Sequence, residues 1–381
     1  MEFKKIDFKN LDDKTKGLLK LLAIVIGAFI AIIIFFGLYT LFVGQVLSFP
    51  KIENVMIRAT KEYVSDHKEI LEKGIYGTIE IKTSDLAAEG LMKDLSKYTR
   101  KGVMCTGSVL VFKNLDDYSY SPKLDCKKDY KYKLLVDEIL KEENIVTEES
   151  GIYKIESETP YYAYRGENVD NYVTFADETW RILRIDNDKN IRLIQENSKN
   201  NTPWDDRYNV EKQYNSGIND FEGTQASRLK DKIMELYNDK EYITKENKSL
   251  IVPKEYCIGK KKEDDLDKTG TIECSVKSEI MGAGSIYISE YLEASLDPNC
   301  FSIKSNSCAN YNYLAKLNNY WTLTANADTT YEVFAVSETS YSKLSSSYSY
   351  VNLVLTINGN INYISGDGTK INPYVIKPII K

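Results

Sequence analysis

The longest apolar run of the chain lies near its N-terminus, where residues 21–43 read LLAIVIGAFIAIIIFFGLYTLFV without a charged side chain. A helix needs about 20 apolar residues to cross the hydrocarbon core of a bilayer, so this run predicts a transmembrane helix. A cleaved signal peptide is the alternative, but its apolar region is shorter, about 7 to 15 residues, and ends at a small-residue cleavage site. The sequence around Val43 lacks such a site. We therefore expect an uncleaved anchor.

The segment after the anchor, residues 44–74, has the periodicity of an amphipathic helix. Apolar side chains recur at steps of three, four or seven residues, at Ile52, Val55, Ala59, Tyr63 and Ile70. Gly74 then marks a helix end. The pattern predicts a stalk helix that continues outward from the anchor. His67, the one histidine of the chain, lies on its charged side, and we assign it no function.

Alternation of apolar and polar residues predicts strands further along the chain. Residues 75–126 read as a small α+β unit that contains a hairpin, and the charge-rich residues 127–150 read as a linker. Strands and turns dominate residues 151–381, with a helix signal at 226–237. The predicted fold class is therefore α+β, with a transmembrane helix, a stalk helix, a small α+β unit and a larger, mixed but mainly-β domain.

Lysines predict the direction of the anchor. Residues 1–20 hold six lysines and four acidic residues, whereas the 20 residues after Val43 hold three cations. Because positively charged flanks stay in the cytoplasm, we expect a single-pass protein of the cell membrane with residues 1–20 as its cytoplasmic tail. Residues 44–381 are then extracellular.

Composition disfavours a nucleic-acid partner. The chain carries 50 Lys and Arg against 56 Asp and Glu, a net charge of −6, so it has no basic excess to neutralise phosphates. The membrane is the partner that the anchor implies. The exported part is acidic, and it should avoid anionic lipid and cell-wall polyanions except through local basic patches.

All six cysteines follow the anchor, in the part predicted to be extracellular. An oxidising compartment favours three disulfides, although six cysteines allow fifteen pairings. Local spacing suggests three pairs, Cys105 with Cys126, Cys257 with Cys274, and Cys300 with Cys308. The alternative is that some of the six are buried free thiols.

The inventory of reactive side chains is poor. With one histidine in the chain, zinc sites and mechanisms that use a histidine base are disfavoured, and no Gly-rich phosphate loop joins a strand to a helix. We predict no catalytic residue, no cofactor-binding residue and no metal ligand. A hydrolase that uses two carboxylates stays open as an alternative, because glycosidases need no more than that.

Two acidic segments are candidate sites. Residues 186–190 read DNDKN, like the start of a calcium loop, but Ile191 and Asn197 stand where such a loop needs Gly and Glu. A polar β-turn explains the same residues. Asp205 and Asp206 in WDDR form either a pair of carboxylates or a buried Arg/Asp corner that holds a loop, and the corner is the commoner arrangement.

Tyrosine is abundant, with 29 in the chain. Most are expected to fill strand faces, but exposed tyrosines suit contacts with carbohydrate or protein because each combines an apolar ring with a hydroxyl. The Ser- and Tyr-rich residues 337–350 read as a hairpin loop or an irregular surface strand. Within them we predict Tyr341, Tyr348 and Tyr350 as exposed, ligand-contacting residues.

Several short segments together resemble known proteins. In the small unit these are CTG at 105–107, YSY at 118–120 and Cys126. In the larger part they are NYVTF at 171–175, WRIL at 180–183, TPWDDRYN at 202–209, GINDF at 217–221, CIGK at 257–260, YWTLT at 320–324 and GDGTKINPY at 366–374. Taken together they resemble a group of membrane-anchored surface proteins of low-GC Gram-positive bacteria.

The larger domain is similar to the C-type-lectin-related fold of formylglycine-generating-type proteins. A closing strand Val-Arg-Pro-Val is usual there, whereas residues 351–354 read VNLV here and lack Arg-Pro. The resemblance places Trp180 and Trp321 in the core and implies that irregular loops carry recognition. It does not imply the copper-dependent oxidase activity, which needs reactive cysteines that the predicted pairs leave unavailable for reaction. The predicted function is extracellular binding or adhesion to a glycan or protein on another cell or in the cell wall.

The N-terminal layout also resembles a type IV pilin-like subunit, with an anchor, a helix and a small disulfide-closed sheet. The residues after Gly17 are LLKLL, however, without the glutamate expected at the fifth position. A pilin-like structural subunit is therefore the alternative to a binding protein.

Overall fold

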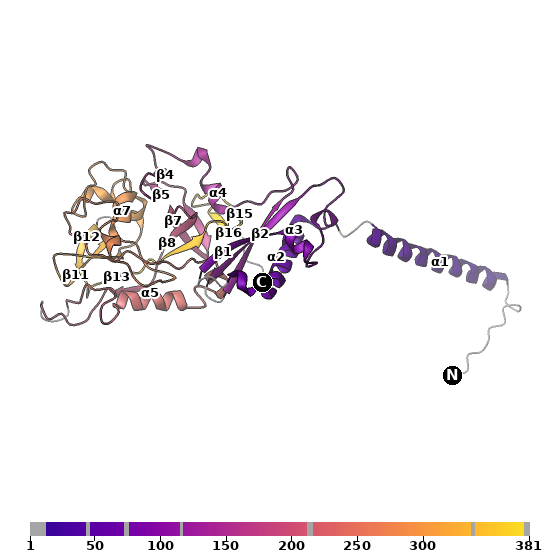
Figure 1. The fold of residues 1–381 in the computed structure, drawn as a ribbon, viewed down its shortest axis with the longest axis horizontal. Coiled ribbons are helices and arrows are strands. Elements are labelled where there is room, and N and C mark those ends of the chain that lie inside the picture. Colours follow the sequence, from indigo (N-terminus) through magenta and orange to yellow (C-terminus); the bar gives the residue numbers. More distant parts are fainter. Residues whose placement is uncertain are drawn as a thin grey trace, which may run out of the picture.

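The computed structural model describes residues 13–42, 46–71, 76–114, 117–211, 216–336 and 340–376. Helices and several sheets occur in comparable amounts, which confirms the α+β class. Figure 1 shows three parts in a row: the helix α1 (Asp13–Phe42), then residues 46–126, and then residues 127–376. We call the second part the front unit and the third the main domain.

The predicted apolar helix is present as α1, and it begins eight residues earlier than the apolar run. Its stretch Lys14–Ile34 is long and apolar enough to cross a membrane, a property that a signal sequence shares. The described apolar side chains of this stretch, such as Leu21 and Ile24, are exposed and contact no core.

The predicted stalk is the helix α2 (Phe49–Asp66), which ends where His67 donates its backbone N–H to the carbonyl of Tyr63. It does not stand apart, because Ile52 and Met56 are fully buried in the core of the front unit. A short 3-10 helix, η2 (Lys68–Leu71), follows it. Residues 72–75, with the predicted stop at Gly74, lie outside the described residues.

The front unit is built on a three-stranded antiparallel sheet, and side chains on both faces of this sheet are buried. Its elements are β1 (Tyr76–Lys82), α3 (Thr83–Ala88), η3 (Leu95–Lys97), β2 (Thr106–Asn114) and β3 (Asp117–Asp125), with β2 in the centre. Side chains alternate across a strand, so Val109 and Val111 of β2 pack with α2. Leu110 and Phe112 point the other way and belong to the core of the main domain.

Residues 127–150, predicted as a linker, pack into the main domain through α4 (Leu135–Ile139). Leu135, Val136 and Ile139 are fully buried in its core. The backbone N–H of Leu135 donates to the carbonyl of Ile361 at 2.9 Å. The sequence pattern did not predict this burial, because charged residues surround the three apolar side chains of α4.

Two sheets build the main domain. The larger runs β14-β8-β7-β6-β16-β15, with β5 beside β7 and β4 beside β5, and the smaller runs β12-β11-β10-β13-β9. The strands are β4 (Gly151–Ile155), β5 (Tyr161–Arg165), β6 (Tyr172–Phe175), β7 (Glu178–Ile185), β8 (Asn190–Gln195), β9 (Asn201–Pro203), β10 (Tyr320–Ala325), β11 (Glu332–Val336), β12 (Ser340–Leu344), β13 (Tyr348–Tyr350), β14 (Val354–Asn358), β15 (Tyr363–Ser365) and β16 (Tyr374–Ile376). The helices are η4 (Glu142–Asn144), α5 (Arg228–Asn238), α6 (Lys245–Lys248), η5 (Glu273–Ser275), α7 (Ile288–Ala294), η6 (Asn306–Ala309) and η7 (Tyr313–Lys316).

Three tryptophans lie in the core of the main domain with no exposed surface. Each indole N–H is satisfied by a backbone carbonyl: Trp180 donates to Phe175, Trp204 to Thr322, and Trp321 to Thr202. The prediction that Trp180 and Trp321 are core residues is confirmed. Because Trp204 follows β9 and Trp321 lies in β10, their two bonds join segments that β13 separates in the sheet.

The three predicted disulfides are present, and no described cysteine is free. They join Cys105 to Cys126, Cys257 to Cys274, and Cys300 to Cys308, at sequence separations of 21, 17 and 8 residues. The first closes the front unit, since it links the start of β2 to the residue that follows β3. The other two hold long irregular segments of the main domain.

A buried ionic cluster joins α7 to the larger sheet. The carboxylate of Glu290, 2% exposed, accepts hydrogen bonds from Nε and Nη2 of Arg192 at 2.8 and 3.2 Å. Nε of Arg184 lies 3.5 Å from Oε1 of Glu290. The carboxylate of Glu293 lies 3.3 Å from Nη2 of the same arginine. Burial lowers the pKa of Arg192, but Glu290 outweighs it and the pKa is raised, so the guanidinium stays charged.

We predict that the substitution Glu290→Gln lowers the free energy of unfolding by about 3 to 5 kcal/mol, because it leaves two guanidinium groups buried without a full countercharge. Chemical denaturation followed by tryptophan fluorescence measures the change. The matched control is Glu235→Gln, which removes a 67% exposed carboxylate paired with Lys232. That substitution should change the free energy by less than about 0.5 kcal/mol. Equal effects in the two variants would refute the role given to Glu290.

We also predict that replacing Cys105 and Cys126 by Ala lowers the opening free energy of β2 by about 3 kcal/mol, because the unfolded front unit gains chain entropy. Native-state hydrogen exchange at the amides of Val109 and Val111 measures it. The control is the pair Cys300→Ala and Cys308→Ala, which should leave these two amides unchanged. A loss of the same size in β2 and β10 would contradict the prediction of a local effect.

Candidate binding surface

The sequence-predicted tyrosines lie where β12 and β13 meet. These strands are joined by residues 345–347 alone, although β11 and β10 separate them in the order of the sheet. The sheet must therefore curl until its first and fourth strands approach. Lys343 of β12 spans the gap, since its ammonium donates to the carbonyl of Tyr348 at 2.7 Å and to Oγ of Ser349 at 3.0 Å. The same ammonium lies 5.2 Å from the ring centroid of Trp321 in β10.

The three tyrosines differ in exposure. Tyr348 is 63% exposed, whereas Tyr341 and Tyr350 are half-buried and pack against the core of the main domain. The expectation that all three are exposed is therefore correct for Tyr348 alone. The curl of the sheet accounts for this difference in exposure, because it turns Tyr341 of β12 and Tyr350 of β13 towards the core.

Asn319 connects the two half-buried tyrosines. Its carbonyl accepts the backbone N–H of Tyr350 at 3.0 Å, and its side chain bonds with the hydroxyl of Tyr341. Oγ of Ser349 lies 3.4 Å from Oδ1 of Asn319. Burial raises the pKa of the Tyr341 phenol, and the bond to Asn319 opposes part of that rise. The phenol therefore keeps its proton at neutral pH and remains a hydrogen-bond donor.

A buried Arg/Asp corner supports this surface from below. Asp205 has no exposed surface, and both of its carboxylate oxygens accept from Nε of Arg207, at 2.9 and 2.7 Å. The backbone N–H of Asp205 donates to the carbonyl of Ser345 at 2.9 Å, so the corner holds the turn between β12 and β13. Asp206 pairs instead with Arg228 at 2.9 Å on the surface. The two carboxylates have separate partners and do not form an acid/base pair.

The surface combines an exposed aromatic ring, phenol and amide groups and a cation, and its backbone is fixed by side-chain hydrogen bonds. Leu344, 41% exposed, adds an apolar side chain beside the turn. We call Tyr341, Lys343, Leu344, Tyr348 and Tyr350 the tyrosine surface. Such a surface can stack an aromatic ring on the apolar face of a sugar or side chain while it hydrogen-bonds the ligand's polar groups. It offers no nucleophile with an adjacent base.

The tyrosine surface lies at one end of the molecule. In Figure 1, β11, β12 and β13 occupy the end farthest from α1, whereas β15 and β16 lie beside the front unit. The strands β11 to β13 and the apolar helix are thus separated by the length of both folded parts.

The segment at 186–190 is a turn between β7 and β8. Asp186 accepts the backbone N–H of Asn190 at 2.8 Å, and Lys189 adopts a positive φ of 63°. The ammonium of Lys254 contacts the second carboxylate oxygen of Asp186, where a calcium ion would bind. Within the described ranges, no group of three or more His, Cys, Asp or Glu side chains is placed to hold a metal ion.

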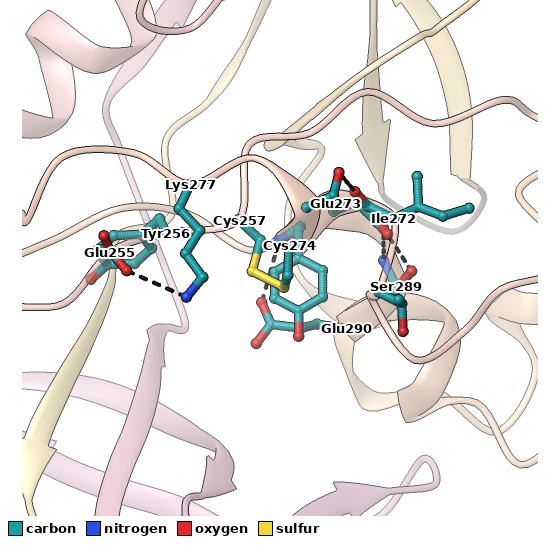
Figure 2. Close-up of a disulfide and its surroundings, with 12 residues drawn as sticks. Glu255, Tyr256, Cys257, Ile272, Glu273, Cys274, Lys277, Ser289 and Glu290 are labelled. Atoms are coloured by element: carbon teal, nitrogen blue, oxygen red, sulfur yellow. Dashed lines mark hydrogen bonds and ion pairs between the residues drawn. A yellow bond between two sulfur atoms is a disulfide. The ribbon is translucent and has the colours of Figure 1, made fainter. Parts of the chain in front are cut away.

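A buried polar cluster that sequence reasoning missed lies beside the Cys257–Cys274 disulfide (Figure 2). Oγ of Ser289 donates to Oε1 of Glu273 at 2.6 Å and accepts from the ammonium of Lys261 at 3.0 Å. Lys261 and Glu273 have fully buried side chains whose charged atoms are 3.6 Å apart. A serine beside a lysine suggests a nucleophile, but here all three side chains are buried and face no solvent. Nothing local in the sequence distinguishes Lys261 from its neighbour Lys260.

No protein-family model matches the chain, and no curated protein or solved structure is significantly similar to it. The resemblance to anchored surface proteins and to a C-type-lectin-like fold therefore stays a prediction from the sequence. What the chain does must be inferred from its own geometry.

Proposed function

We propose that this protein is a single-pass cell-surface protein whose main domain binds a glycan or protein ligand outside the cell. The observation that carries the proposal is the position of the tyrosine surface at the end of the molecule farthest from α1 (Figure 1). On an anchored protein, that end is the one that a ligand on another cell or in the cell wall reaches first.

Two independent features support the membrane anchor and its direction. The exposed apolar side chains of α1 need a lipid environment, and the lysine-rich tail before it favours a cytoplasmic N-terminus. All three disulfides follow α1, and disulfides persist outside the cytosol. Both features support an outer position for the front unit and the main domain.

The composition of the tyrosine surface supports binding rather than chemistry. Tyr348 exposes an amphipathic ring at low entropic cost, and Lys343 and Asn319 hold the backbone beneath it. Loops and turns on a rigid scaffold commonly carry recognition. A C-type-lectin-like framework, as the sequence resemblance suggests, would use the main domain in the same way.

The topology predicts the result of protease treatment. Protease added to intact cells should remove the chain after Gly44 and spare an epitope placed on residues 1–20. Permeabilised cells are the control, since there the tail epitope should also be lost. Protection of residues 75–381 in intact cells would contradict the proposed direction.

The binding proposal predicts that Tyr348→Ala weakens saturable binding on a glycan and protein array at least tenfold, about 1.4 kcal/mol, while the melting temperature stays nearly unchanged. The full chain in detergent is the probe. The control is Ile371→Ala, which shortens a 96% exposed apolar side chain near β16, at the other end of the main domain. The proposal fails if the unaltered chain binds nothing, or if both variants bind as it does.

A further inference from the structure

The end of the front unit nearest α1 carries a concentration of exposed cations. They come from two loops, one before β2 and one after β3, and they are Lys93, Lys97, Arg100, Lys101, Lys127 and Lys128. The carboxylates nearby are Asp94, Asp125 and Asp129, so the cations outnumber them two to one. Asp94 and Asp125 already accept backbone N–H groups, of Ser96 and Lys127. This local excess contrasts with the net charge of −6 of the whole chain.

Exposed apolar side chains lie among these cations. Met104 is 68% exposed and Val46 is 45% exposed. Val103 lines two neighbouring hollows, one of about 500 Å³ that Val46 and Arg100 also line, and one of about 460 Å³ that Met104 and Lys127 also line. The apolar and basic side chains therefore share one continuous face. We call it the anchor-proximal face, comprising Val46, Met104 and the six cations.

The chain itself holds this face close to the end of α1. Val46 follows Phe42 by four residues, which span at most about 14 Å when fully extended. The backbone N–H of Leu47 then donates to the carbonyl of Tyr98 at 2.8 Å, within the loop that carries Lys97 and Arg100. If α1 spans a bilayer, the anchor-proximal face lies at the level of the lipid headgroups.

From this placement we propose that the anchor-proximal face binds the headgroups of anionic lipids around α1, with Met104 and Val46 entering the interface. The proposal rests on the membrane anchor of the proposed function and adds a lipid preference to it. A basic segment next to a membrane helix attracts anionic lipid, and exposed apolar side chains add burial at the same boundary. The contact fixes the front unit upright on the membrane, because it adds a second attachment beside α1.

Lysine footprinting of the full chain in nanodiscs tests the proposal. Acylation of Lys97, Lys101 and Lys127 should be about fivefold slower in discs that contain phosphatidylglycerol than in discs of phosphatidylcholine alone, the factor that corresponds to about 1 kcal/mol per cation. High salt should abolish the difference, because it screens exposed charges. Lys262 and Lys304 of the main domain, with side chains 62% and 60% exposed, are internal controls and should react equally in both discs.

A variant and a competitor complete the test. The triple substitution Lys97→Glu, Lys101→Glu and Lys127→Glu should stay in the discs but lose the lipid dependence at Lys93 and Lys128. Equal acylation of the unaltered chain in both discs would overturn the lipid proposal while leaving the anchor intact. Failure of the chain to enter discs would refute the anchor itself. Equal protection by soluble polyphosphate in phosphatidylcholine discs would assign the face to a soluble polyanion and overturn the proposal.

Discussion

The main domain depends on the buried carboxylate of Glu290, because it ties the helix between the two sheets to the larger one. Through Arg184 and Arg192 it holds β7 and β8 of the larger sheet. Through α7, whose first backbone N–H donates from Ile288 to the hydroxyl of Thr324 at 2.9 Å, it reaches β10 of the smaller sheet. Tyrosine rings cover the two guanidinium groups, Tyr161 over Arg184 and Tyr256 over Arg192, so the cluster is shielded from water and its ion pairs are strengthened.

The front unit is joined to the main domain by a strand whose side chains pack in both cores. Alternation along β2 sends Val111 to one core and Phe112 to the other, so one strand serves two cores. Polar contacts add direction to this interface, since Asn362 donates to the carbonyl of Pro122 at 2.7 Å and Ser119 to that of Ser249 at 3.0 Å. The two parts are thus packed against each other and are not beads on a flexible linker.

Sequence reasoning succeeded where the signal is local. A charge-free run identified α1, short spacings identified the disulfides, and flanking strand residues together with the resemblance placed Trp180 and Trp321 in the core. It failed where burial depends on distant partners: Tyr341 is covered because the sheet curls and Asn319 meets its hydroxyl. Lys261 is likewise buried by Glu273 and Ser289, which no short window of sequence contains. The binding property of Tyr348 and the lectin-like fold remain predictions.

Rigid packing connects the tyrosine surface at one end of the molecule with the anchor-proximal face at the other. The tyrosine surface is held by Lys343, Asn319 and the Asp205 corner, so its backbone is ordered without a ligand and the proposed binding would lose little further entropy. Rigid packing of the front unit on the main domain transmits that order along the molecule. The proposed binding at this surface requires that the other end of the molecule is also held, because free rotation about the proposed anchor would average out the orientation of the surface. The cations and apolar side chains beside Val46 give the front unit the chemistry for the proposed second attachment, and they lie at the end of the front unit nearest α1.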